Sequence, residues 1–261
     1  MAFKKAVDVE SAKKTTSNSS EASRFLDMYK QNVRDGLLSD PHVPSKSFAP
    51  SSLRCLRQQW FRLRGTKPDL YAEPDVTLDF IADIGTHCHE NIQSNLEKFL
   101  GDDWLDVESY LESQDIPYSY SCEKHGYETR IKVDYPPVKF ACDGLIRFGG
   151  TVYLLEIKTS ERKSMESLVM PKQEHLDQIK CYCTLLNVED AMVMYQDRQY
   201  GSLKCFTYRL SDSDRSSILN TFSDVERYVN SNIVPPALPV GDKWCNSSYC
   251  RYFKTCRKWG V

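Results

Sequence analysis

The sequence contains no hydrophobic run of membrane-spanning length, and its formal net charge is only −2. Because a spanning helix needs about 18 or more consecutive apolar residues, we expect no membrane segment. The first residues also lack the apolar stretch of a secretory signal, which indicates a reducing compartment, the cytosol of a bacterium or of a phage-infected host. The near-neutral charge excludes a protein that binds nucleic acid over its whole surface, so any DNA contact must be local.

The composition otherwise indicates a globular chain without internal repeats. Hydrophobic residues make up 41% of the 261 residues, which is enough for a sizeable core in one large domain. Residues 1–20 are polar, aperiodic and rich in serine, lysine and threonine, so we expect a disordered tail there. Residues 21–261 are expected to form a single domain.

Apolar spacing changes along the chain from helical to strand-like and back. Steps of three and four residues predict helices at 21–38, 51–65, 75–100, 172–187 and 211–232. Runs rich in β-branched and aromatic residues predict strands at 129–135, 139–148, 151–159, 191–196 and 204–210. We expect the helix at 51–65 to be capped by Ser51 and Ser52, the last helix by Ser211 or Asp212, and a proline-rich linker at 39–50. A three-stranded meander among helices, followed by two further strands, predicts a mixed α/β domain.

The Gly149-Gly150 pair is the most informative stretch for function. A two-residue glycine loop favours a primed turn and fixes the hairpin register, which places Asp143 directly opposite Glu156. Side chains opposed in this way project from the same face, with Cβ atoms roughly 4.5–5.5 Å apart. Two carboxylates so close repel by about 1 kcal/mol in water and about 4 kcal/mol at an effective dielectric of 20. A divalent cation between them relieves that repulsion.

Two neighbours of Glu156 complete the pattern. Lys158 lies two residues further along the strand and therefore projects from the face of Glu156, whereas Ile157 points into apolar packing. A metal ion and an ammonium group over a phosphate are what phosphodiester hydrolysis needs. Because the pattern is short, a solvated hairpin edge is the alternative interpretation of the same residues.

The flanking motifs resemble the RecB-like branch of the PD-(D/E)XK nuclease superfamily. CDG contains Asp143, LLEIKTS contains Glu156 and Lys158, IGTHCHENI resembles the G-T-x-x-H motif, and HLDQIKCYCTLL contains Q-x-x-x-Y. The motifs occur in the family's order over about a hundred residues. The resemblance implies a restriction-endonuclease-like core, a mixed central sheet flanked by helices, with a helical N-terminal region.

The resemblance also implies roles for individual residues. It assigns Mg²⁺ or Mn²⁺ to His89, Asp143, Glu156 and the carbonyl oxygen of Ile157. It makes Lys158, Glu156 and Asp143 catalytic, and has Gln178 and Tyr182, one helical turn apart, contact the phosphate or position Lys158. Taken alone, His89 is more readily a partly buried structural histidine, and Tyr182 is more readily a core residue. The nearby His87 is left unassigned.

Cysteines gather at the C-terminal end of the chain. Of ten in all, Cys245, Cys250 and Cys256 lie within the last 17 residues, and Cys55 stands alone near the other end. One cysteine before the core and three after it resemble the layout of RecB-like nucleases that carry an iron–sulfur cluster, including the CRISPR-associated RecB-like exonucleases and the AddB nuclease domain. This resemblance implies a structural [4Fe–4S] cluster in a lobe formed by Cys55 and residues 245–256. Four thiolates bind zinc equally well, so Zn²⁺ stays open. The six scattered cysteines are expected to be small core residues.

Basic residues surround Cys55 and suggest a local contact with DNA. Arg54, Arg57, Arg62 and Arg64 could follow phosphates, with a solvated basic face as the alternative.

Together the motifs predict a metal-dependent deoxyribonuclease, an exonuclease acting on DNA ends that are single-stranded or carry single-stranded tails, in recombination, repair or phage-type DNA processing. The alternatives are a structure-selective endonuclease and a non-catalytic Fe–S or zinc DNA-binding assembly factor. Further copies of the chain and recombination or replication proteins stay open as partners.

Overall fold

The structure is a computed structural model that describes residues 19–39, 45–69, 76–239, 241–247 and 249–259. The chain forms two compact units, Met1–His42 with Tyr71–Ile81, and Val43–Leu70 with Ala82–Val261. Most of the predicted tail, residues 1–18, and part of the predicted linker, residues 40–44, lie outside the described residues. The expectation of one domain over 21–261 stays a prediction.

The first unit contains helix α2 and the first turn and a half of helix α4. α2 runs from Ser19 to Ser39 and confirms the helix expected at 21–38. The aromatic ring of Tyr29 stacks on that of Phe80 with centroids 5.9 Å apart. Elsewhere on α2 the predicted apolar stripe is exposed, with Phe25 at 73% and Met28 at 62% of their full accessibility.

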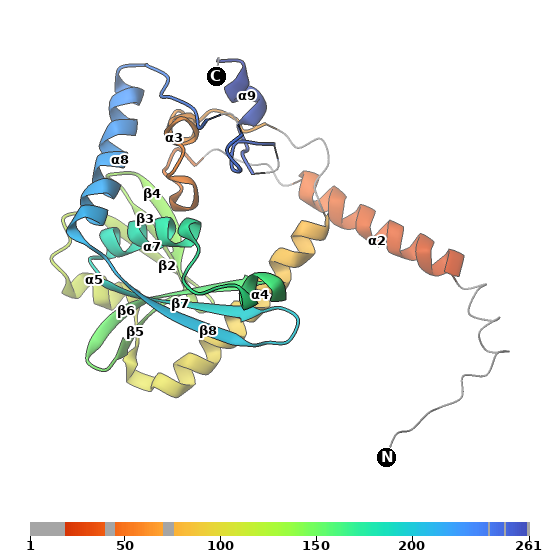
Figure 1. Cartoon of the computed structure of the whole chain (residues 1–261), viewed down its shortest axis with the longest axis horizontal. Coiled ribbons are helices and arrows are strands. Elements are labelled where there is room, and N and C mark those ends of the chain that lie inside the picture. Colours follow the sequence, from red (N-terminus) through yellow and green to blue (C-terminus); the bar gives the residue numbers. More distant parts are fainter. Residues whose placement is uncertain (1–18, 40–44, 70–75, 240, 248, 260–261) are drawn as a thin grey trace. The chain divides into compact units, whose positions relative to one another are not determined.

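The second unit is built on two sheets (Figure 1). The strands of the five-stranded sheet, in spatial order, are β1 (Trp104–Leu105), β5 (Gly144–Phe148), β6 (Thr151–Ser160), β7 (Asp190–Asp197) and β8 (Leu203–Arg209). β6 and β7 pair in parallel and the other pairs are antiparallel, so the sheet is mixed. The three-stranded sheet contains β2 (Tyr120–His125), β3 (Glu128–Val133) and β4 (Val138–Cys142).

This arrangement corrects the expected three-stranded meander. The run at 139–148 is not one strand, because it divides at Asp143 into β4 of one sheet and β5 of the other. β2 was not predicted at all. The Gly149-Gly150 hairpin is confirmed: both glycines have positive φ, +58° and +80°, and Phe148 pairs with Thr151.

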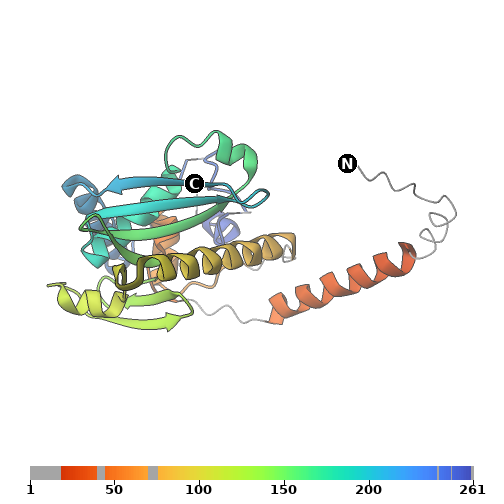
Figure 2. The ribbon, with the colours of Figure 1, turned by 90° about the horizontal axis from the view of Figure 1, so that it is seen from below.

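Helices cover both faces of the five-stranded sheet, as Figures 1 and 2 show. α4 (Val76–Leu100) packs on one face, where Ile92 meets Leu155 and Ile157 of β6. α7 (Gln173–Leu186) and α8 (Asp212–Asn230) belong to the core on the other face, with Leu154. Because alternate residues of a strand share a face, Glu156 and Lys158 project toward the α7 side. The mixed α/β fold class is confirmed and is compatible with a restriction-endonuclease-like core.

Helix ends follow local sequence signals at some places and not at others. Ser211 caps α8 in a capping box with Asp214, as expected for one of the two candidates. The expected helix at 51–65 is wrong in its first turn: Pro50–Ser52 forms the 3-10 turn η1, and α3 runs only from Leu56 to Leu63. Cys55, in an extended conformation, precedes α3, so Ser51 and Ser52 do not cap it.

Four short helices complete the described chain: η2 (Gly101–Asp103), α5 (Val107–Ser113), α6 (Arg162–Glu166) and α9 (Phe253–Arg257). They are too short to show a period in the sequence. None of the helices within the described residues is long and apolar enough to cross a membrane.

Candidate functional site

Asp143 lies where the ladders of two sheets end. The last pair of the β3–β4 ladder is Thr129 with Cys142, and the last pair of the β5–β6 ladder is Gly144 with Leu155. Asp143 is the single residue between β4 and β5. One step beyond each last pair, it meets Glu128 in one register and Glu156 in the other. Three acidic residues therefore follow one another across the junction of the two sheets.

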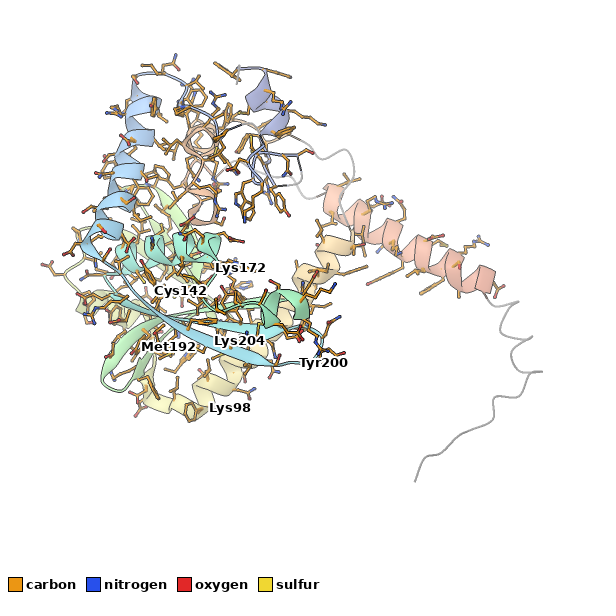
Figure 3. All side chains as sticks on the ribbon, in the orientation of Figure 1. Lys98, Cys142, Lys172, Met192, Tyr200 and Lys204 are labelled. Atoms are coloured by element: carbon orange, nitrogen blue, oxygen red, sulfur yellow. The ribbon has the colours of Figure 1, made fainter. Side chains whose placement is uncertain are left out.

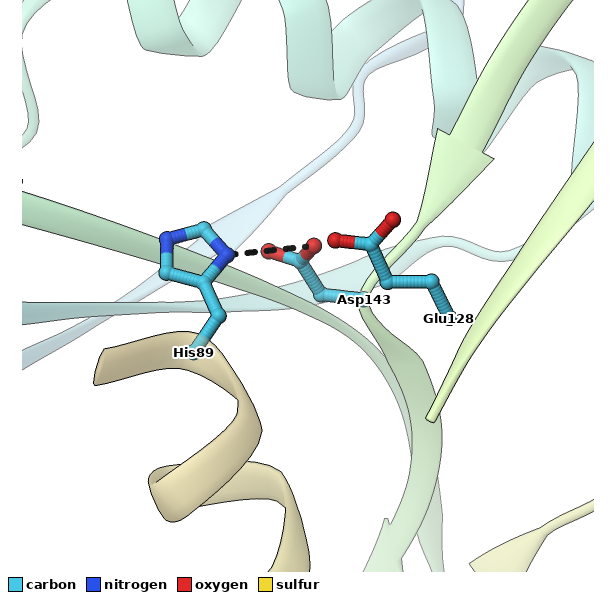
Figure 4. A group of neighbouring side chains, drawn as sticks. All are labelled: His89, Glu128 and Asp143. Carbon is cyan, nitrogen blue, oxygen red and sulfur yellow. Dashed lines mark ion pairs between the residues drawn. The ribbon is translucent and has the colours of Figure 1, made fainter. Parts of the chain in front are cut away.

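His89 joins this junction from α4. Single ligand atoms of His89, Glu128 and Asp143 all lie within 4.8 Å of one another. Figure 4 shows the three side chains directed toward one another. His89 Nδ1 is 3.6 Å from Asp143 Oδ1. Burial raises the pKa of Glu128, the negative charge of Asp143 raises it further, and the nearby His89 opposes the rise. Carboxylate oxygens with one imidazole are a ligand set suited to Mg²⁺ or Mn²⁺, so these residues fit a divalent ion.

Asp143 is fixed in place by two hydrogen bonds. Its Oδ2 accepts one from the backbone N–H of Ile157 at 2.6 Å. Its backbone carbonyl accepts another from the side chain of Gln93 at 2.7 Å, and Gln93 is buried. Gln93 lies one helical turn after His89 on α4. The same helix therefore supplies a candidate ligand and holds the backbone of the neighbouring one.

Glu156 and Lys158 form a buried ion pair on β6, in which the ammonium group donates to the Glu156 carboxylate. Burial raises the pKa of Glu156 to about 7; Lys158 opposes this rise and Asp143 adds to it. Burial lowers the pKa of Lys158, but the charges of Glu156 and Asp143 outweigh that effect and the pKa is raised overall. Lys158 is therefore a cation at neutral pH.

Helix α7 provides polar contacts next to Lys158. Lys158 Nζ donates to Gln178 Oε1 at 3.4 Å, and Gln178 Nε2 donates to the Tyr182 hydroxyl at 2.8 Å. The Tyr182 ring stacks on Phe140 of β4 with centroids 4.5 Å apart. Burial raises the pKa of Tyr182 well above its ordinary value, so its hydroxyl keeps its proton. A chain of polar contacts thus runs from Glu156 to the core.

The structure brings most of the sequence-predicted site residues into one neighbourhood. His89 and Asp143 belong to the candidate metal group, whereas Glu156 is not a member of it within the described part of the chain. The side chain of Ile157 is buried against α4, as expected, and the ligand role of its carbonyl stays a prediction. Sequence reasoning missed Glu128, because the β2–β3 hairpin around Gly126 went unrecognised. It also missed Gln93, although a polar residue inside the apolar stripe of α4 was a usable signal.

A second candidate centre is a pocket at the other end of the unit. Its lining includes all four predicted cluster residues, Cys55, Cys245, Cys250 and Cys256. Burial raises the pKa of the Cys55 thiol, and it raises that of Cys250 to about 11. Phe61, Trp244, Tyr252 and Phe253 also line the pocket. Two other aromatic residues of the C-terminal segment, Tyr249 and Trp259, do not line it, and both are exposed.

Four thiols in one sheltered pocket fit a metal ion or cluster, but they are not drawn tightly together. Within the described residues, no three of these sulfur atoms lie within 4.8 Å of one another. A single zinc ion bound at about 2.3 Å from each sulfur would hold them about 3.8 Å apart.

Asp69 forms hydrogen bonds with the C-terminal segment that lines part of the cysteine pocket. Its carboxylate accepts hydrogen bonds from the backbone N–H of Lys254 at 2.6 Å and from the hydroxyl of Thr255 at 2.6 Å. The backbone N–H of Thr255 also donates to both carboxylate oxygens, at 3.1 and 3.2 Å. These groups are the first turn of α9, which contains Cys256. Asp69 therefore caps α9 from a distant part of the chain.

The four arginines predicted to contact DNA are engaged by the protein. Arg57 is buried and donates to the carbonyl of Pro235 at 2.8 Å and to Cys256 Sγ at 3.6 Å. The other three make the following contacts: Arg62 with Ser47 and Ser45, Arg64 with Asn232 and the Trp60 ring, and Arg54 with Asp177 and the Trp244 ring. Their role toward DNA stays a prediction.

The six scattered cysteines are mostly, but not all, core residues. Cys142, Cys181 and Cys183 are fully buried, and Cys88 and Cys122 are partly buried. Cys205 is exposed on β8, so the expectation is wrong for this residue.

No protein-family model matches the chain, and no curated protein matches it. Among solved structures, that of SSO0001 shares 15% identity and a TM-score of 0.48, covering 90% of this chain and 96% of its own. An alkaline exonuclease from Laribacter hongkongensis shares 14% identity and a TM-score of 0.46, covering 72% of this chain and 90% of its own. Its complex with dAMP shares 14% identity and a TM-score of 0.43, covering 68% and 78%. Values this low assign neither family nor activity, so function has to be argued from the geometry of the site.

Proposed function

We propose that this chain is a metal-dependent deoxyribonuclease. The observation that carries the proposal is the position of Asp143 between Glu128 and Glu156, with His89 Nδ1 3.6 Å away and the ion pair of Lys158 beside them. Like charges gathered in a buried place destabilise the fold unless cations compensate them. Lys158 compensates one carboxylate, and the remaining charge supports a divalent ion.

The residues divide the chemistry among them. His89, Glu128 and Asp143 would hold Mg²⁺ or Mn²⁺, and Glu156 and the Ile157 carbonyl stay candidate ligands. When bound, the ion would polarise a phosphate oxygen and lower the pKa of a coordinated water. Lys158, a cation at neutral pH, would orient the attacking water or the phosphate.

Gln178 would position this ammonium group, and Tyr182 would act on it through its hydrogen bond with Gln178. These contacts would keep the ammonium group of Lys158 directed at Glu156. Mutation of such a positioned general acid–base group typically costs 10²–10⁴-fold in rate, so we expect on the order of a 10³-fold loss for Lys158→Met.

Within this class we favour an exonuclease acting on DNA ends in recombination, repair or phage-type DNA processing, on the motifs of the sequence. A structure-selective endonuclease and a non-catalytic DNA-binding assembly factor are the outcomes that the same experiment separates. DNA labelled at one end and circular single-stranded DNA should be incubated with the protein and Mg²⁺ or Mn²⁺. An exonuclease degrades only the linear substrate, an endonuclease also cuts the circle, and an assembly factor binds but leaves both intact.

Matched variants test the assignment of the site. Glu156→Gln and Lys158→Met should lose metal-dependent cutting, whereas Glu123→Gln and Lys139→Met, at exposed positions on β2 and β4, should retain it. Undiminished cutting by either site variant would refute the nuclease site proposed here. Circular dichroism of all four variants controls for folding.

We further propose that the cysteine pocket holds a structural [4Fe–4S] cluster, with Zn²⁺ as the alternative. The four thiols that line one pocket support a bound metal group, and the resemblance of the cysteine pattern to that of iron–sulfur nucleases favours the cluster. Anaerobically purified protein should absorb visible light and contain iron rather than zinc. Stoichiometric zinc without iron would overturn the iron–sulfur proposal.

A further inference from the structure

Helix α7 presents a third polar residue beside the two that support Lys158. His175, Gln178 and Tyr182 are separated by three and four positions and therefore lie along one face of the helix. That face covers β6 and β7, where Lys158 and Tyr195 are direct partners in the parallel ladder. Gln178 contacts Lys158, and His175 contacts Tyr195. His175 thus lies one strand away from the lysine of the proposed site.

The hydroxyl of Tyr195 fixes the protonation of the histidine ring. Tyr195 is fully buried, and its oxygen accepts a hydrogen bond from the backbone N–H of Lys172 at 3.1 Å. His175 Nδ1 lies 2.7 Å from the same oxygen. A buried hydroxyl proton needs an acceptor, and in the described part of the chain Nδ1 is the one within reach. Nδ1 is therefore the acceptor, and the ring proton of neutral His175 is on Nε2.

The surroundings of His175 favour an anionic ligand. Burial lowers the pKa of His175 to about 4, and the positive charges of Lys158, Lys172 and Arg54 contribute to this shift against Glu174. The ring is therefore neutral at physiological pH, and three cations gather around it. Lys172, at the start of α7, is labelled in Figure 3. Within the described residues, Nε2–H makes no hydrogen bond to the protein, so this donor is available to a ligand.

We propose that His175 donates a hydrogen bond from Nε2 to a phosphate of the bound DNA strand next to Lys158, and that Tyr195 is the positioning residue that selects the required tautomer. This inference rests on the proposed nuclease function, because it takes DNA as the ligand. A neutral donor suits this place, since a fourth positive charge would be repelled by the three cations. Sequence motifs gave His175 no role.

Binding of DNA tests the proposal without requiring catalysis. A fluorescein-labelled single-stranded oligonucleotide is titrated with full-length protein in Ca²⁺, and its affinity is followed by fluorescence anisotropy. His175→Ala should weaken binding about tenfold, the effect of one lost hydrogen bond to a charged group. His175→Gln, which keeps an N–H donor, should recover most of the affinity. His87→Ala, on the exposed side of α4, should bind like the parent protein.

Two results separate this inference from the proposed function. If the parent protein cuts DNA and His175→Ala binds as tightly as the parent, the inference is wrong and the nuclease proposal stands. If binding depends on His175 but no divalent metal supports cutting, the nuclease proposal fails and the phosphate contact stands.

The tautomer provides a spectroscopic readout for Tyr195. In ¹⁵N-labelled protein, long-range ¹H–¹⁵N correlations should show the proton of His175 on Nε2. Tyr195→Phe removes the hydroxyl proton and should give a mixture of both tautomers together with weaker DNA binding. A proton on Nδ1 in the parent protein would overturn the assignment.

Discussion

Removal of the Asp69 carboxylate should loosen the C-terminal segment locally, and the structure gives the size of the effect. The carboxylate accepts hydrogen bonds from three groups in the first turn of α9: the N–H groups of Lys254 and Thr255 and the hydroxyl of Thr255. Loss of such a cap typically costs about 0.5–2 kcal/mol, and the bonds to a charged acceptor place this one at the upper end, about 2 kcal/mol. That difference corresponds to a roughly 30-fold increase in the open population of the segment.

Hydrogen exchange followed by mass spectrometry measures this opening directly. In Asp69→Ala, the amides of residues 253–257 should exchange about 30-fold faster, while those of β6 and β7 keep the rates of the parent protein. Asp69→Asn keeps one acceptor oxygen and should show a smaller increase. Asp115→Ala replaces an exposed aspartate as a matched control. Unchanged exchange at 253–257 in Asp69→Ala would show that the carboxylate does not hold α9.

Three further perturbations follow from individual contacts. Phe61→Ala removes a ring that is 1% exposed and stacks on the ring of Tyr252 with centroids 5.3 Å apart. Urea unfolding should therefore show a free energy of unfolding lower by about 3–5 kcal/mol. A decrease below about 1 kcal/mol would contradict the packing. Lys204→Met removes hydrogen bonds to the carbonyl oxygens of Met165 in α6, at 2.6 Å, and of Leu168 just after α6, at 2.9 Å, and should accelerate hydrogen exchange at 162–168; unaltered exchange would mean that those bonds do not hold this segment. Bonds from Lys124 and Ser109 lower the pKa of Asp106 from 3.8 to about 2. The stabilising contribution of Asp106 is therefore present above pH 4 and is lost as the pH falls toward 2. In Asp106→Asn, the free energy of unfolding should depend less on pH between 4 and 2 than in the parent protein. The same pH dependence in both proteins would refute the pairing.

Local signals in the sequence were sufficient to predict the β5–β6 hairpin and the long helices. The two glycines at 149 and 150 fix a primed turn, and every pair of the β5–β6 ladder follows from it. α4, β7 and β8 show clear periods and were predicted within a few residues. Ser211 and Asp214 form the capping box that begins α8.

The sequence did not predict which strand belongs to which sheet, because that depends on pairing between distant residues. The run at 139–148 was predicted as one strand because apolar residues occur on both sides of Asp143. Only tertiary pairing decides that Cys142 ends one ladder and Gly144 begins another. Glu128 was missed for this reason: its neighbourhood with Asp143 depends on the β3–β4 register, which the sequence did not predict.

Side-chain partners of the arginines also lay beyond prediction. The composition of this basic helix predicts a phosphate-binding face. In the structure, however, Arg57 donates hydrogen bonds to the carbonyl of Pro235 and to the sulfur of Cys256, which are far away in sequence. Burial of a guanidinium depends on packing of the C-terminal segment, which leaves no local trace in the residues around Cys55.

The position of Asp143 at the end of two ladders makes strand alignment itself a condition for the proposed metal binding. Slippage of β3 by one residue against β4 would turn Glu128 to the opposite side of the small sheet and bring Tyr127 or Thr129 level with Asp143. An ion held by Glu128 and His89 would resist that slippage, because ligands that bind only the native arrangement stabilise it by mass action, about 2.7 kcal/mol at a concentration 100 times the dissociation constant. The fraction of protein that holds a metal ion and the fraction with the native β3–β4 register would then increase or decrease together.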